Sequence, residues 1–351
     1  MRILKLLCLH ICHLLGLFYI TMSGTRGKLL ILCYHGFELK DESKFRPKLF
    51  MSEERFRSHM EILSKHKVQV LPLPVALEKL YQGRLSTGAV AITIDDGFFS
   101  DYAIGYPVLR SYNFPATLYI YSYYVNKDVP VFRLAVQYMF WKSEVEKIEL
   151  NDIVWTDNEF VDLRNKKASD KVMWQCITYG EKLSSETERM ILLSELSSLF
   201  DVDLQAMKSN RMFSLLTLDE IRELSENGMD IQLHTHNHEF PMDNEVIAKQ
   251  EILRNREVLS KVTNKELVHF CYPSGIWNMQ QWHWLDSLGI RSATTCETGY
   301  NDASIHKFAL KRFLDGENIS DIEFLSEITG FSEKLRSVRP EFRFSNKIID
   351  L

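Results

Sequence analysis

The 351-residue sequence lacks the signals of several common protein classes. Its six cysteines are scattered and include no Cys-x-x-Cys pair, which argues against a disulfide framework and against a zinc finger. No Gly-x-Ser-x-Gly elbow, glycine-rich phosphate loop, internal repeat or low-complexity tract is present. The net charge is only −5, so the composition gives no reason to expect nucleic-acid binding. These absences disfavour serine hydrolases, phosphate-loop enzymes and nucleic-acid-binding proteins.

The overall composition is that of a folded globular protein. Hydrophobic residues make up 45% of the chain and charged residues 25%. The length is enough for one large domain or two ordinary ones.

The sequence does not decide whether the first 22 residues lie on a membrane, pack on the domain or form a targeting segment. Residues 6–20 are mostly apolar, as in a signal peptide, but two histidines interrupt the run. At 100° per residue, five residues share a stripe roughly 140° wide: Arg2, Lys5, His10, His13 and Gly16. This favours an amphipathic helix lying on a membrane or on the domain. A signal or anchor segment is the alternative, and a spanning helix is disfavoured by the charges inside it. We therefore expect a cytoplasmic or membrane-associated protein rather than an exported one, with peripheral membrane contact through residues 1–22.

Two adjacent acids follow a short apolar stretch near the middle of the N-terminal half. Residues 91–94 are apolar or β-branched and predict a buried strand, after which come Asp95, Asp96 and Gly97. In α/β sheets, ligands bind at the carboxyl ends of strands. Two carboxylates held together repel each other unless a cation offsets their charge. The pattern therefore predicts a cation at this strand end.

Paired histidines follow a second apolar segment. His234 and His238 come after residues 229–233 and are four apart, so one helical turn would direct both imidazoles the same way. Two histidines and one aspartate form a set with open positions at which a catalytic metal can hold water.

These motifs resemble those of the polysaccharide deacetylases, carbohydrate esterase family four. The resemblance rests on Asp-Asp-Gly after one strand and His-Thr-x-x-His after another, in that order. It extends from about residue 29 to about residue 313, with one interruption. Three further pieces agree with it: Tyr34-His35-Gly36, Phe114-Pro115-Ala116-Thr117 and Phe270-Cys271-Tyr272-Pro273-Ser274-Gly275.

The resemblance implies a fold and a metal site. The fold would be a distorted (β/α) barrel of about seven to eight mostly parallel strands. Asp96, His234 and His238 would be the metal ligands, and Asp95 the general base. Zinc is the first choice by ligand type, although iron, cobalt, nickel and manganese also suit two histidines and a carboxylate.

The later motifs of the family are altered in this chain. In the family an arginine of the third motif tethers the base, whereas here that position is Cys271. Arg312, at the end of a late predicted strand, is our candidate for the missing charge. Backbone N–H groups of the loop at Tyr272, Pro273 and Ser274 are expected to hold the oxyanion, with Tyr272 alternatively serving only in packing. His35, at the end of an early strand, is expected to support the site.

The group that protonates the leaving amine is the least defined part of the expected site. The final family motif, Leu-x-His, has no clean copy in the sequence. His306 is the nearest late candidate. His236, His269 and His283 are the others.

The chain divides into three expected parts. Residues 1–27 form the N-terminal helix or targeting segment, residues 28–325 the catalytic domain, and residues 326–351 a tail. Residues 126–213 break the strand–helix alternation and predict a largely helical insertion beside the mouth of the site. The insertion either confers substrate specificity or only packs against the barrel.

The expected function is metal-dependent hydrolysis. Metal-bound water would attack an N-acetyl carbonyl of a glycan such as a surface polysaccharide, its precursor or peptidoglycan. Two alternatives remain: an amidase or esterase acting on a non-sugar substrate, and a non-catalytic glycan-binding protein that keeps the fold.

Overall fold

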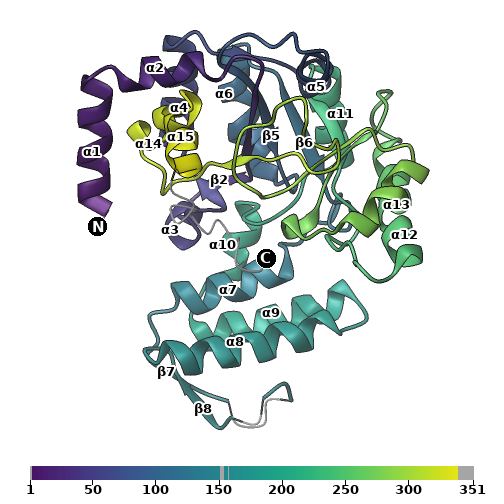
Figure 1. Ribbon diagram of the computed structural model, residues 1–351. Coiled ribbons are helices and arrows are strands. Elements are labelled where there is room, and N and C mark those ends of the chain that lie inside the picture. Colours follow the sequence, from purple (N-terminus) through teal and green to yellow (C-terminus); the bar gives the residue numbers. More distant parts are fainter. Residues whose placement is uncertain (1, 151–153, 157, 339–351) are drawn as a thin grey trace.

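The computed structural model describes residues 2–150, 154–156 and 158–338. A curled parallel sheet lies at its centre, with helices around it (Figure 1). The sheet has the strand order β11-β10-β9-β6-β5-β1-β12, and β4 pairs with the start of β5. Its strands are β1 (Leu29–Tyr34), β4 (Gln69–Val70), β5 (Ala89–Ile94), β6 (Ala116–Ile120), β9 (Asp230–Leu233), β10 (His269–Cys271), β11 (Ser292–Thr294) and β12 (Phe313–Leu314).

All pairings within this sheet are parallel, which confirms the expected distorted (β/α) barrel. Every residue of β1, β5 and β6 is buried, as expected for strands covered on both faces. The last residues of β1 and β5, Tyr34 and Ile94, are paired, as are those of β6 and β9, Ile120 and Leu233, and β10 extends one residue past its pairing with Leu233. Side chains that follow these strands therefore gather at one edge of the sheet.

One late segment closes the curl of the sheet. Leu310 forms a parallel bridge with Thr294 of β11, and Phe313 then pairs with Leu32 of β1. Arg312 lies between these two contacts. The strand expected over residues 308–312 is thus shifted toward residues 313–314.

Helices cover the sheet in the expected alternation. Ser52 caps α4 and Thr217 forms a capping box with Glu220 at α11, both as the sequence predicts. The helices of the barrel are α3 (Glu42–Phe45), α4 (Glu53–Lys65), α5 (Leu73–Tyr81), α6 (Tyr106–Ser111), α11 (Leu218–Glu226), α12 (Glu245–Leu259) and α13 (Trp282–Ser287). A π-helical turn at Asp101–Gly105 leads into α6, and β2 (Gly36–Phe37) pairs with β3 (Phe50–Met51).

Helix α12 differs from its sequence prediction. Asn244, not Asp243, caps it. The apolar pattern predicts a buried stripe of Val246, Ile247, Ile252, Leu253 and Leu259. Ile252 and Leu259 are buried, but Val246, Ile247 and Leu253 are exposed, and the polar residues Glu251 and Asn255 are buried instead. The polar residues turn inward because they hold a loop of the site, as described below.

The segment between β6 and β9 is largely helical. It contains α7 (Phe132–Lys142), α8 (Lys166–Glu181), α9 (Glu186–Phe200) and α10 (Leu204–Ser209). An antiparallel hairpin of β7 (Lys147–Glu149) and β8 (Phe160–Asp162) adds a feature that the sequence did not predict. Figure 1 shows α7, α8 and α9 together below the sheet, with the hairpin at their outer side.

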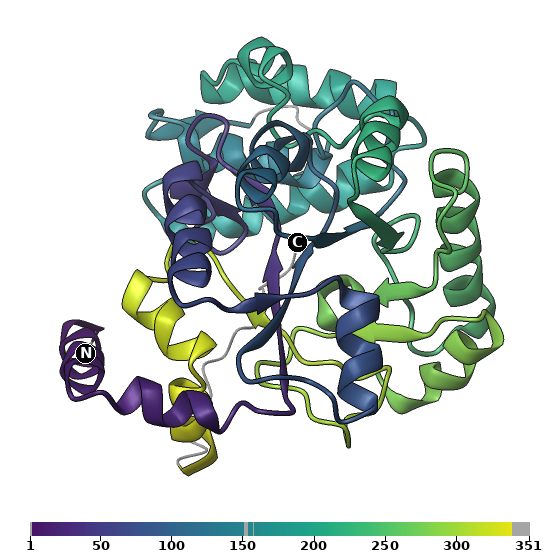
Figure 2. The same ribbon diagram turned by 90° about the horizontal axis from the view of Figure 1, so that it is seen from above.

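Two pairs of helices lie at the ends of the described chain. α1 (Arg2–Leu14) and α2 (Leu17–Ser23) precede the barrel, and α14 (Asp321–Ile328) and α15 (Phe331–Val338) follow it. The expected boundary at residue 325 falls inside α14, whose side chains are mostly buried. Figure 2 shows α1 at the edge of the molecule, beyond these C-terminal helices.

No single helix among the described residues is long and apolar enough to cross a membrane. The pair α1 and α2 passes the length and hydropathy criteria only when the two are taken together, and they are bent by 75°.

Candidate metal centre

Three predicted ligands converge at the carboxyl edge of the sheet. Oδ1 of Asp96 lies 3.4 Å from Nε2 of His234 and 3.4 Å from Nε2 of His238. The ligand atoms of all three residues lie within 4.8 Å of one another. Asp96 follows β5 and the histidines follow β9, so the parallel register of the sheet brings them together.

The histidine pair lies in a loop, so the predicted helical turn is wrong. Thr235 and His238 have φ values of 70° and 62°, in the left-handed region. The two imidazoles still face one place, with ring centroids 4.9 Å apart. Their common direction comes from the fold of the loop and not from an i, i+4 helical spacing.

Two buried polar residues of α12 hold this loop. Asn255 accepts a hydrogen bond from the backbone N–H of His234 at 3.0 Å and donates one to the carbonyl of Ile120 at 2.9 Å. Glu251 accepts hydrogen bonds from the backbone N–H groups of His236 and Asn237. Neither residue was predicted from the sequence to belong to the site. The available signal was a pair of polar residues, four apart, on the otherwise apolar side of an amphipathic helix.

The ring orientation of His234 is fixed by a hydrogen bond on the side away from Asp96. Its Nδ1 lies 2.8 Å from the carbonyl oxygen of Cys271, which can only accept, so Nδ1 carries the proton. Nε2 is thereby left to face Asp96. A backbone carbonyl on the far nitrogen is the usual support for a metal-binding histidine.

The unsatisfied atoms of Asp96 and His238 fit a cation. Both carboxylate oxygens of Asp96 and Nε2 of His238 are buried and have no hydrogen-bond partner among the described residues. Burial lowers the pKa of His238 to about 4, so its imidazole is neutral near pH 7 and has a free lone pair. Unpaired buried acceptors are costly, and a divalent cation would satisfy all of them.

Asp95 is held by Arg312. Nη1 and Nη2 of Arg312 lie 2.7 Å from Oδ1 and Oδ2 of Asp95, and the arginine is fully buried. Its Nε donates to the carbonyl of Thr295, which fixes the plane of the guanidinium. Burial raises the pKa of Asp95, but Arg312 outweighs burial and the net pKa lies below the ordinary value. Asp95 is therefore ionised at neutral pH.

Other predicted residues surround Asp95. Nε2 of His35 lies 3.8 Å from Oδ2 of Asp95, and burial lowers the pKa of His35. The thiol of Cys271, at the position of the family's arginine, lies 3.4 Å from the same oxygen. Arg312 thus reaches the acid from another strand, while a small thiol leaves room for it.

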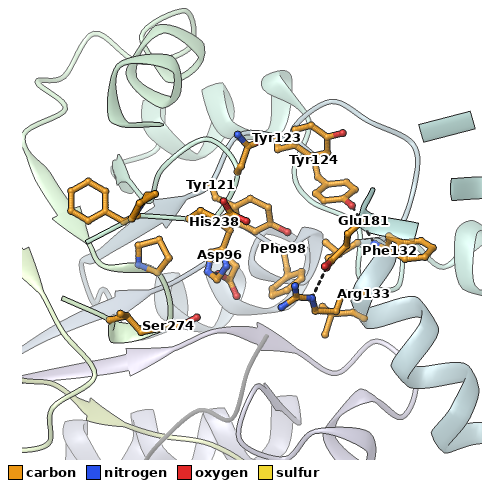
Figure 3. A pocket seen from close by; sticks show the side chains of 18 of the residues that line it. Asp96, Phe98, Tyr121, Tyr123, Tyr124, Phe132, Arg133, Glu181, His238 and Ser274 are labelled. Atoms are coloured by element: carbon orange, nitrogen blue, oxygen red, sulfur yellow. Dashed lines mark hydrogen bonds and ion pairs between the residues drawn. The ribbon is translucent and has the colours of Figure 1, made fainter. Parts of the chain in front are cut away.

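A cavity of about 690 Å³ opens above the three ligands. Asp96 and His238 contribute to its wall, whereas Asp95 and His234 are buried beside them. Figure 3 shows Asp96 and His238 between Ser274 on one side and Phe132, Arg133 and Glu181 on the other. The last three come from α7 and α8, so the insertion forms part of the cavity wall.

The third-motif loop offers one backbone donor. The N–H of Tyr272 donates to Thr294, the N–H of Gly275 donates to Tyr272, and Pro273 has none. Ser274 has a φ of 55° and lines the cavity with Pro273. Tyr272 is buried, and its hydroxyl donates to the carbonyl of Phe308. Of the three predicted residues, Ser274 alone has an N–H that is not used by a hydrogen bond within the described chain.

His306 lies outside this arrangement. It is exposed and stacks on Trp282, with ring centroids 3.7 Å apart, and it is not among the residues that line the cavity. His236, a further candidate, pairs its Nδ1 with the hydroxyl of Ser122 at 2.9 Å. Among the histidines of the described chain, His238 is the one that lines the cavity.

The family model for polysaccharide deacetylases matches residues 202–293, which contain the histidine loop and the third-motif loop. Over these residues the chain is similar to the polysaccharide deacetylases. YxkH of Bacillus subtilis (strain 168), which is named as a polysaccharide deacetylase, is 32% identical over 95 residues. Those residues make up 27% of this chain and 32% of the length of that relative, so the chain spans about a third of the relative that it matches.

Solved structures show the same fold. Deacetylase PplD of Streptococcus pyogenes, in complex with acetate, has a TM-score of 0.56 at 17% identity; the match covers 86% of this chain and 98% of that one. IcaB of Ammonifex degensii has a TM-score of 0.55 at 15% identity, with 86% and 97% covered. At these sequence identities the structural similarity shows that the chain has the polysaccharide deacetylase fold, and it shows the fold alone.

Proposed function

We propose that this chain is a metal-dependent hydrolase that removes N-acetyl groups from a glycan. One observation carries the proposal. Asp96, His234 and His238 direct ligand atoms to one point at the base of a cavity, those of Asp96 and His238 have no partner in the described part of the chain, and a second, ionised acid lies next to them. A divalent cation bound there, zinc by preference for this ligand set, would polarise the acetyl carbonyl and lower the pKa of a water molecule.

The residues of the chain have distinct proposed roles. Asp95, kept ionised by Arg312, accepts the proton of the attacking water. The N–H of Ser274 donates to the oxygen of the tetrahedral intermediate, since it is the donor of that loop which the fold leaves unused. His35 and Cys271 fill the space behind Asp95 and exclude bulk water.

The cavity supports a sugar as the carrier of the acetyl group. Its wall contains aromatic rings that can stack on the flat faces of pyranose rings, namely Tyr121, Tyr123, Tyr124, Phe132 and Phe240. Arg133 and Glu181 add a charged pair, with Nε 2.7 Å from Oε1, that can hydrogen-bond to sugar hydroxyls. Because α7 and α8 supply Phe132, Arg133 and Glu181, we propose that the insertion sets the choice of glycan.

The test combines metal analysis with acetate release. The purified full chain is reconstituted with zinc, cobalt, nickel or manganese and incubated with a panel of N-acetylated oligosaccharides and O-acetylated controls. We expect about one metal ion per chain, bound by Asp96, His234 and His238, and acetate with a matching amount of free amine. Bound metal without acetate from any substrate would overturn the proposal and favour a glycan-binding protein.

Variants of the cavity wall test the role of the insertion. Arg133→Ala and Glu181→Gln should raise KM for the best substrate with a smaller effect on kcat, because these residues lie to one side of the ligands (Figure 3). Arg164→Ala is a matched control, since Arg164 also pairs with acids in the insertion but does not line the cavity. Equal KM values for all three variants would contradict this role.

A further inference from the structure

The N-terminal helix α1 attaches to the domain by a side that carries both polar and apolar residues. Nζ of Lys5 lies 2.5 Å from Oε1 of Glu323, and Arg2 donates to the carbonyl of Asn318 at 2.6 Å. Leu9 and Phe18 are the buried apolar anchors of α1 and α2, and the ring of Phe18 lies 4.8 Å from that of Phe331. The pair is thus fixed on the C-terminal helices α14 and α15.

The opposite side of the pair is apolar and open. It carries large side chains that are between 63% and 84% exposed: Ile3, Leu4, Leu14, Leu15, Tyr19 and Ile20. We call these six residues the N-terminal apolar face. An amphipathic helix of a globular protein normally turns its large apolar side chains inward, whereas here these six face outward. A contiguous exposed apolar patch of this kind marks an interaction surface.

Charge favours one kind of partner. Residues 1–28 contain four cations, Arg2, Lys5, Arg26 and Lys28, and no acid, whereas the whole chain has a net charge of −5. Arg2 and Arg26 are exposed near the two ends of the helix pair. Aliphatic side chains flanked by cations suit the boundary between acyl chains and anionic headgroups.

The geometry suits a surface and not a span. α1 and α2 are joined at a 75° bend, and neither is long enough to cross a bilayer. Figures 1 and 2 both place α1 at the periphery of the molecule, with the rest of the chain on one side of it. A flat lipid surface can therefore reach α1 without meeting the barrel.

We propose that α1 and α2 bind the surface of a membrane that contains anionic lipids, with the N-terminal apolar face inserted among the acyl chains. The helices stay docked on α14 and α15 through Lys5 and Glu323, so the catalytic barrel is held at a fixed orientation to the lipid. The binding does not depend on the proposed deacetylase activity.

Vesicle co-sedimentation of the full chain tests this proposal. The lipids are phosphatidylcholine alone and phosphatidylcholine mixed with phosphatidylglycerol. The variant is Leu4→Gln with Leu14→Gln, which removes two exposed side chains and leaves the docked side unchanged. The matched control is Ile191→Gln with Val246→Gln, which removes apolar side chains of similar exposure from α9 and α12.

We expect the wild type and the control to bind the mixed vesicles, more weakly at high salt. The variant should bind at least about tenfold more weakly, since each leucine inserted into hydrocarbon contributes more than one decade of affinity. Acetate release from soluble oligosaccharides should be the same in wild type and variant, which separates this result from the proposed function.

Two results would overturn the proposal. One is equal vesicle binding by the variant and the wild type. The other is light scattering that shows a wild-type dimer, a monomeric variant and no vesicle binding by either, because the N-terminal apolar face would then be covered by a second copy of the chain.

Discussion

Arg312 and Asp95 form a two-pronged hydrogen-bonded ion pair in the interior, although they are 217 positions apart. Both N–O distances are 2.7 Å, and the arginine is fully buried. The contact exists because the segment after β11 crosses to β1 and closes the curled sheet, which carries Arg312 to the end of β5. The same pairing that closes the barrel therefore also orients Asp95 beside the ligands.

Replacing Arg312 should affect both stability and activity. Arg312→Ala leaves the Asp95 carboxylate buried without its partner, so we expect the free energy of unfolding to fall by about 3–5 kcal/mol. Arg312→Lys keeps the positive charge but loses the paired hydrogen bonds of the guanidinium. Its stability and its activity should lie between those of Arg312→Ala and the wild type. Denaturant unfolding and acetate release measure the two effects. Lys311→Ala, at the neighbouring partly exposed position, is the control, and unchanged acetate release in Arg312→Ala would refute the role.

Substitutions of the two adjacent acids, Asp95 and Asp96, should have different effects on metal binding and on turnover. Asp96→Asn removes a ligand charge, so the protein should lose its metal and its activity together. Asp95→Asn keeps the three ligands and should retain the metal while acetate release falls by about 10²–10⁴-fold. Metal content per chain, measured beside turnover, distinguishes them. Loss of metal in Asp95→Asn would instead assign Asp95 to metal binding.

The buried polar residues of α12 should control metal affinity without touching the metal. Asn255→Ala or Glu251→Gln loosens the histidine loop, and we expect affinity to weaken about 10–100-fold, as for other residues that orient ligands. Titration with a competing chelator provides the measurement. Glu257→Gln, on the exposed side of the same helix, should bind metal like the wild type. If Glu251→Gln binds the metal as tightly as Glu257→Gln does, the histidine loop keeps its conformation without Glu251.

His306, the residue that the sequence suggested as general acid, should be dispensable for turnover. It is exposed and stacked on Trp282, away from the residues that line the cavity. Loss of a general acid costs about 10²–10⁴-fold in rate, and we expect no such loss in His306→Ala. Steady-state kinetics on the best substrate decide the matter, and a fall in kcat of that size would restore the original assignment.

Removing the metal should destabilise the fold. A ligand that binds only the folded state at about a hundred times its dissociation constant adds about 2.7 kcal/mol to the free energy of unfolding. The thermal midpoint should therefore fall when a chelator is added and recover with excess zinc. Asp96→Asn should show no such shift. A chelator-sensitive midpoint in that variant would place the metal elsewhere.

Local patterns were sufficient to predict much of this protein. The apolar strand before Asp95 and Asp96, the cap at Ser52 and the capping box at Thr217 depend on neighbours in the chain, and each is present in the structure. The periodicity of apolar residues gave a wrong prediction at α12, because it placed Val246 and Leu253 in the core, whereas both are exposed. The residues inside are Glu251 and Asn255, because their hydrogen bonds to the histidine loop outweigh the cost of burying them.

By itself, the sequence determined which residue types stand at the ends of the strands, and with them the resemblance to the polysaccharide deacetylases and the kind of candidate ligand set. Strand ends are local features, and parallel pairing brings them to one edge. Only the tertiary structure decided how Arg312, a candidate from the sequence, meets Asp95, which amide of the third-motif loop is left free, and which side of α1 faces outward. Those outcomes depend on contacts between segments far apart in the chain, and residue spacing carries no information about such contacts.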